Sequence, residues 1–141
     1  MAVLTEDVRN STQKEFEELP GKVKLVVFTQ EFECDHCREN TSLAKEVAAL
    51  SGQVGIEVND FVLDKEAVER YGVDKIPAIV VEGEKDYGVR FYGVPAGYEF
   101  SSLIEAIKAV SAGESGLAAK TKEALAGLKD PLHLQVLVTP T

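Results

Sequence analysis

The only two cysteines of this 141-residue chain lie in one motif, Cys34-Asp35-His36-Cys37. An apolar, strand-like run over 23–29 precedes the motif, and a segment with the periodicity of an amphipathic helix follows it. The free N–H groups and the positive dipole end of a helix stabilise a thiolate at that position. Two intervening residues on a first helical turn also bring two sulfur atoms within reach of a disulfide. The motif therefore predicts a strand–turn–helix unit that carries a dithiol/disulfide redox site.

The order of the two cysteines predicts their roles. Cys34 is the expected nucleophile, and Cys37 is the expected resolving thiol that attacks a mixed disulfide formed at Cys34. Two other interpretations stay open, a structural pair and half of a zinc or iron–sulfur site that bridges two chains. A structural zinc site normally needs four protein ligands, and besides carboxylates only His36 and His133 remain. We favour the redox interpretation and expect neither a metal nor a bound cofactor.

Composition narrows the class of protein. Hydrophobic residues make up 45% and charged residues 28% of the chain, as in ordinary soluble globular proteins. A net charge of −9 argues against a nucleic-acid or anionic-membrane surface. The N-terminus lacks a basic segment followed by an apolar one, and no run approaches the roughly 18 apolar residues of a membrane span. We expect a cytoplasmic protein, in which a cysteine pair is more often catalytic than structural.

Apolar periodicity and turn residues predict an α/β fold. The expected helices are 5–18, 34–50, 64–71 and 99–112, and the expected strands are 22–30, 55–63, 78–82 and 87–92. Alternating strands and helices predict parallel pairing through right-handed crossovers, and the last two strands predict an antiparallel hairpin. The result is a central four-stranded mixed sheet with helices on both faces.

A proline at the start of the third strand carries the first family resemblance. Pro77 follows Ile76, lies 40 residues after Cys37 and opens a strand after a short helix. Together with the cysteine motif, this arrangement resembles the thioredoxin superfamily. The resemblance implies that the Ile76–Pro77 bond is cis and faces the cysteines, and that the Ile76 backbone binds the substrate chain.

A second motif, Gly-Val-Pro-Ala-Gly-Tyr-Glu-Phe at 93–100, narrows the resemblance. It is similar to a turn in the glutaredoxin-like protein disulfide oxidoreductases and in the related N-terminal domain of the alkyl hydroperoxide reductase flavoprotein, which both carry two thioredoxin-fold units. The run 134–139 also echoes 24–29 at an offset of 110 residues. We therefore divide the chain into a thioredoxin-fold unit with the CxxC motif, 1–113, and a linker helix with the first strand of a truncated second unit, 114–141.

This division has a consequence for assembly. The chain is expected to be either the N-terminal part of a longer protein or a short natural form. In both cases the helix expected near 117–128 and the strand after it would leave an apolar patch and a free sheet edge. Such a surface would allow two copies of the chain to form a homodimer.

The surroundings of Cys34 depart from the commonest thioredoxin pattern. His36 resembles the histidine of protein disulfide isomerases, where it stabilises the thiolate and raises the potential. The buried acid of thioredoxins corresponds by spacing to Phe28, so that proton acceptor is absent. Asp60 is a candidate substitute, but we favour the interpretation that it is an ordinary exposed carboxylate at the end of a strand. Phe32 stands near the position where many relatives carry tryptophan. We expect a potential between about −270 and −180 mV.

The resemblance implies a protein disulfide oxidoreductase that reacts through Cys34 and Cys37 and is recharged by a thioredoxin-reductase-like flavoprotein. The catalytic set is then Cys34, Cys37 and His36, and the substrate-binding set is Ile76 and Pro77. One alternative keeps the fold but makes the chain a redox relay or a structural unit that supports a second, missing CxxC domain. The other is the metal or iron–sulfur module.

Overall fold

The computed structural model describes residues 2–139. The elements are α1 (Glu6–Phe16), β1 (Val23–Thr29), α2 (Cys37–Ala48), β2 (Val54–Asp60), α3 (Lys65–Tyr71), β3 (Ala78–Glu82), β4 (Asp86–Tyr92), the short 3-10 helix η1 (Gly97–Glu99), α4 (Phe100–Ala112) and α5 (Ala119–Ala126). None of these helices combines the length and the apolar character that crossing a membrane would require.

The four strands form one mixed sheet in the order β2-β1-β3-β4. β1 and β2 are parallel, whereas β3 is antiparallel to both β1 and β4. The expected mixed sheet is confirmed, but the parallel pairing expected for the third strand is wrong. The reason is the length of α3, since seven helical residues span about 10 Å and a seven-residue strand about 23 Å. The chain therefore enters β3 at the end of the sheet where β1 and β2 finish, and β3 runs in the opposite direction.

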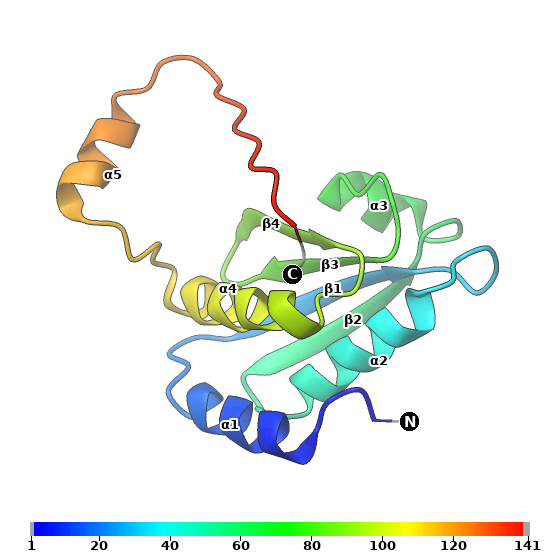
Figure 1. Cartoon of the computed structure of the whole chain (residues 1–141). Coiled ribbons are helices and arrows are strands. Elements are labelled where there is room, and N and C mark those ends of the chain that lie inside the picture. Colours follow the sequence, from blue (N-terminus) through cyan, green and yellow to red (C-terminus); the bar gives the residue numbers. More distant parts are fainter. Residues whose placement is uncertain (1, 140–141) are drawn as a thin grey trace.

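Helices cover both faces of the sheet, as the sequence predicts (Figure 1). Alternation along β1 sends Leu25 and Val27 to one face, where they pack with residues of α1, α2 and α4. Val26 and Phe28 point to the other face, which α3 covers. The side chains of these four consecutive residues are fully buried, so β1 forms the centre of the core. The cysteine motif begins five residues after the end of this strand.

A turn before β1 is held to the end of α4. Ser111 Oγ donates to the Gly21 carbonyl oxygen at 2.6 Å and accepts from the Gly21 N–H at 3.0 Å. A Cβ atom at Gly21 would lie 2.6 Å from the Ser111 carbonyl oxygen, so only glycine allows this approach. The contact fixes α4 against the start of the sheet.

The C-terminal part of the chain lies away from the sheet. Figure 1 shows α5 and the segment after it as an arc beside the main body. Residues 128–139 form no helix or strand, and every residue from 114 to 139 is exposed. The end of this segment returns to the start of α4, where Val138 and Thr139 line a hollow with Tyr98. The strand expected at 134–139, and the second unit that it would begin, are not shown by the structure.

The N-terminal segment is fastened to α2 by one carboxylate. Glu46 accepts hydrogen bonds from the Val3 N–H at 2.6 Å and the Leu4 N–H at 3.1 Å, and Arg9 Nη1 lies 3.0 Å from it. The Val3 N–H, followed by the Leu4 N–H and the Arg9 charge, lowers the pKa of the Glu46 carboxyl against the opposing effect of burial. Charge on Glu46 therefore stabilises the folded chain.

Glu46→Gln is expected to lower the free energy of unfolding at pH 7 by about 1 kcal/mol, because the amide cannot replace the charged acceptor. A carboxyl whose pKa is depressed by folding contributes stability above its unfolded pKa of about 4.3, and this contribution is lost as the pH falls through the folded value. The difference between wild type and Glu46→Gln in urea unfolding should therefore disappear near pH 3. An equal difference at pH 7 and pH 3 would contradict this account.

Candidate redox site

Cys34 and Cys37 form a disulfide at the carboxyl end of β1, with their Cα atoms 5.5 Å apart. Cys34 is half-buried, whereas Cys37 is completely inaccessible to solvent. Reactivity in a thiol–disulfide site requires access to the attacking sulfur. The pair therefore offers one sulfur to a substrate and keeps the other behind it.

The active-site helix begins later than the sequence suggests. α2 starts at Cys37 with His36 as its N-cap residue, so Cys34 lies before the helix and not on its first turn. The Asn40 N–H donates to the His36 carbonyl oxygen at 3.0 Å and closes the first helical turn. Glu33, in the left-handed region at φ +58°, turns the chain just before Cys34. Through the disulfide, the Cys34 sulfur still sits beside the positive end of α2.

The Ile76–Pro77 bond is cis, as the resemblance implies. It lies beside the cysteine loop, because Ala78 pairs with Phe28 near the end of β1. Pro77 is buried, and its carbonyl oxygen accepts from the Gly93 N–H at 2.9 Å. Ile76 is half-buried, and its main chain makes no hydrogen bond within residues 2–139. That main chain can accept a hydrogen-bonding partner from outside the chain.

His36 is exposed at the N-cap of α2, where its side chain lies beside Glu39. Its Nδ1 lies 3.7 Å from Glu39 Oε2, and both side chains are well exposed. The Glu39 carboxylate can thus pair with a protonated His36. Four exposed acidic residues and one exposed basic residue surround the motif: Glu31, Glu33, Asp35, Glu39 and Arg38. This environment favours an approaching cationic segment over an anionic one.

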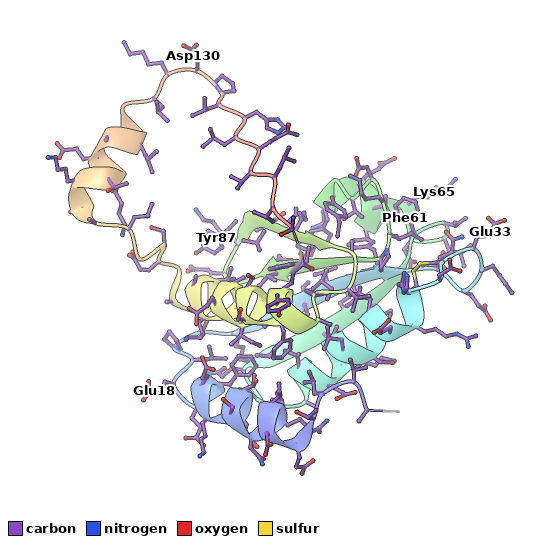
Figure 2. The ribbon with its side chains drawn as sticks, in the orientation of Figure 1. Glu18, Glu33, Phe61, Lys65, Tyr87 and Asp130 are labelled. Carbon is purple, nitrogen blue, oxygen red and sulfur yellow. A yellow bond between two sulfur atoms is a disulfide. The ribbon has the colours of Figure 1, made fainter. Side chains whose placement is uncertain are left out.

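Apolar side chains stand exposed at the same edge of the sheet. Because β1 and β2 are parallel, the loops that follow them meet there, and Figure 2 shows the labelled Glu33 and Phe61 at the end of the molecule that holds the yellow disulfide bond. Phe32, Val62 and Leu63 are 72%, 52% and 80% exposed, and we call these three residues the apolar rim. Exposed apolar groups beside a reactive centre suit contact with a protein substrate.

The sequence places two rim residues wrongly within a strand. β2 ends at Asp60, whose Oδ1 accepts from the N–H groups of Val62 and Leu63 at 2.8 and 2.9 Å. These bonds form an Asx-type turn and lift both side chains into solvent. The Asp60 carboxylate is therefore engaged in the turn, and these contacts give no support to the alternative that it acts as a proton acceptor.

Two other sequence expectations concern groups away from the disulfide. Phe28 is fully buried on the α3 side of the sheet, where it meets Tyr71 edge-to-face with ring centroids 6.0 Å apart. His133 is exposed in the C-terminal segment. Within residues 2–139, no three or more His, Cys, Asp and Glu side chains are grouped so that they could hold a metal ion.

A mixed four-stranded sheet of this order, with a cysteine pair at the start of its first crossover helix and a cis-proline beside the pair, defines a thioredoxin-like protein. Residues 22–105 match the family described as thioredoxin domain, and the chain belongs to this family.

Two kinds of relative refine this assignment. A protein disulfide oxidoreductase from Aeropyrum pernix superposes with a TM-score of 0.81 at 29% identity, over 92% of this chain and 57% of that one. The N-terminal NTD_N/C domain of the alkyl hydroperoxide reductase AhpF from Enterococcus faecalis gives a TM-score of 0.76 at 25% identity, over 89% of this chain and 61% of that one. The resemblance seen in the sequence is confirmed.

A curated relative extends the similarity to nearly the whole chain. The alkyl hydroperoxide reductase AhpF of Staphylococcus epidermidis is 28% identical over 145 residues, which cover 99% of this chain and 25% of that protein. The chain thus spans a quarter of that reductase and little more than half of the archaeal oxidoreductase.

Proposed function

We propose that the chain is a thiol–disulfide oxidoreductase that acts on protein disulfides. The observation that carries this proposal is the disulfide between a half-buried Cys34 and a fully buried Cys37 at the start of α2. The similarity to an archaeal protein disulfide oxidoreductase supports it. The apolar rim and the unpaired main chain of Ile76 provide the contacts that a polypeptide substrate needs.

In the reducing direction, the Cys34 thiolate attacks one sulfur of the substrate disulfide. A Cys34–substrate disulfide forms, and the second substrate sulfur leaves with the electron pair. The Cys37 thiolate then attacks Cys34 Sγ, which forms the intramolecular disulfide and releases the first substrate sulfur. The substrate has gained two electrons and the two protons of the dithiol. The oxidising direction reverses these steps.

Three residues have supporting roles in this proposal. Ile76 binds the substrate main chain beside Cys34, and Pro77 shapes that surface. His36, when protonated, adds positive charge near the developing thiolate, although its pairing with Glu39 at 3.7 Å offsets part of that effect. The similarity to the alkyl hydroperoxide reductase AhpF supports a flavoprotein reductase as the electron donor.

A redox titration against glutathione, read by thiol alkylation, tests this function together with insulin reduction in the same preparation. We expect a reversible two-electron couple between about −270 and −180 mV and reduction of insulin. A pair that never forms a disulfide would overturn the redox function, and metal analysis with an absorption spectrum would then test the metal or iron–sulfur module.

A redox relay is the second candidate function, and the exposed C-terminal part of the chain favours it. Leu125, Leu128, Leu134 and Leu137 expose between 49% and 95% of their surface, which is costly unless another unit covers them. In this proposal the segment after residue 114 belongs to a second thioredoxin-fold unit. The rest of that unit covers these leucines and exchanges electrons with the Cys34–Cys37 pair. A homodimer would cover the same residues. A pair that titrates reversibly while insulin stays oxidised would favour the relay.

A further inference from the structure

Asn40 is a polar side chain enclosed in the apolar core. It is completely buried on α2, on the stripe that also buries Cys37, Leu43, Ala44 and Val47. Neither Nδ2 nor Oδ1 of Asn40 has a hydrogen-bond partner within the described residues. An amide buried in this way loses its hydration without compensation. A buried polar group without a partner needs an explanation, and a hydrogen bond that forms only when the disulfide is open would provide one.

Asn40 and Cys37 lie on the same buried face of α2. Asn40 follows Cys37 by three residues, a spacing that puts two side chains on one helical face about one turn apart. The Cα–Cβ bond of a helical residue also leans toward the N-terminus, over the residues three and four positions earlier. The side chain of Asn40 thus leans toward Cys37 at the first turn of α2.

Cys37 lacks any other buried polar neighbour of this kind. The buried polar side chains of residues 2–139 are Thr12, Asn40 and Asn59, and no carboxylate is among them. Asn59 donates to Glu57 at 3.1 Å on the edge strand β2 and is already satisfied. Among these buried polar side chains, Asn40 is the one that shares the buried face of α2 with Cys37, so it is the side-chain donor assigned here to a Cys37 thiolate.

We propose that Asn40 Nδ2 donates a hydrogen bond to Cys37 Sγ when the disulfide is open. This inference rests on the proposed function. In the closed disulfide, Cys37 Sγ shares its electron pair with Cys34 Sγ and is a weak acceptor, and the amide stays unpaired. When a substrate thiolate attacks Cys34 Sγ, a Cys34–substrate disulfide forms, and Cys37 Sγ leaves with the electron pair and becomes a strong acceptor. Asn40 thereby stabilises the thiolate that resolves the mixed disulfide, while the thiol proton passes to the released substrate thiolate.

Reaction of the reduced chain with Ellman's disulfide separates the two chemical steps. Attack by Cys34 releases the first thionitrobenzoate, and attack by Cys37 on the resulting mixed disulfide releases the second. Asn40→Leu keeps the branching of the side chain and removes the donor. We expect the second phase to slow about tenfold and the first to stay unchanged. The dithiol–disulfide equilibrium with glutathione should also shift about tenfold toward the disulfide, which corresponds to about 30 mV.

Val47→Ala is the matched control on the same buried stripe. It weakens the core two helical turns further on and should leave both phases and the glutathione equilibrium unchanged. If Asn40→Leu does not fold, Asn40→Ala carries the same measurements. An Asn40 variant with an unchanged second phase and an unchanged equilibrium overturns the proposal, even if it melts at a higher temperature.

The same experiments separate failure of the inference from failure of the proposed function. A wild-type chain that shows both phases but leaves insulin oxidised would contradict the action on protein disulfides, and the comparison between wild type and Asn40→Leu would still decide the role of Asn40. A wild-type chain that shows only the first phase would overturn both, since no resolving thiolate would then exist.

Discussion

Cys34→Ser will reduce insulin no faster than buffer, whereas Cys37→Ser will accumulate a stable mixed disulfide with its substrate. The difference follows from exposure, because Cys34 is reachable from solvent and Cys37 is completely buried. A serine hydroxyl is not ionised at neutral pH and cannot replace the attacking thiolate. Without Cys37, the first exchange still occurs, but no internal thiol releases the substrate. Mass spectrometry of the non-reduced protein measures the adduct directly.

Two results would contradict these roles. Residual turnover in Cys34→Ser would mean that Cys37 becomes accessible, and an adduct in Cys34→Ser but not in Cys37→Ser would reverse the assignment. Both variants should keep the thermal stability of the reduced wild-type chain, which serves as the control for folding. Because the disulfide joins positions only three apart in the chain, its loss should change the unfolded state little.

The sequence predicted the core of the site because its signals are local. A buried strand, a CxxC motif and an amphipathic helix follow each other without interruption, and the cis Ile76–Pro77 bond came from a family resemblance with a defined place for proline. The start of α2 was less predictable. Glu33 has a left-handed backbone, and residues 35–36 form a turn, so the first helical hydrogen bond comes later than expected. The residue types at these positions do not require these conformations.

Val62 and Leu63 of the apolar rim were misplaced for a different reason, whereas Phe32 had been singled out from the sequence. Phe61, Val62 and Leu63 have the composition of a strand, and their placement depends on the Asp60 carboxylate capturing two N–H groups. An aspartate at a strand end is the signal that could have identified the turn. Asn40 also had a usable signal, since it lies three residues after Cys37 and four before Ala44 on a helical face that is otherwise apolar.

Longer-range features could not be predicted from local patterns. The direction of β3 depends on α3 being too short to return the chain across the sheet, which becomes evident only when its bounds are known. The run 134–139 has the composition of a strand, but a strand forms only beside a partner whose hydrogen-bonding groups are free. The sheet of the described residues consists of β1 to β4 and does not include this run.

Phe28→Ala is expected to lower the free energy of unfolding by about 3–5 kcal/mol. The Phe28 ring is fully buried between β1 and α3 and meets Tyr71 edge-to-face, so its removal leaves a cavity that the rigid sheet cannot fill. For a chain of this size, the melting temperature should fall by roughly 10–20 °C. Urea and thermal unfolding followed by circular dichroism measure both quantities.

Phe32→Ala removes the same ring four residues away, where it is 72% exposed. Its free energy of unfolding should stay within about 0.5 kcal/mol of wild type, because little apolar surface is buried there. Phe32 belongs to the apolar rim, so this variant should raise KM for insulin while the reaction with a small disulfide is unchanged. A destabilised Phe32→Ala, or equal losses with insulin and with the small disulfide, would show that the ring supports the fold of the cysteine loop and does not contact the substrate. The pair of variants thus separates the aromatic group that holds β1 in place from the one that the loop presents to a partner.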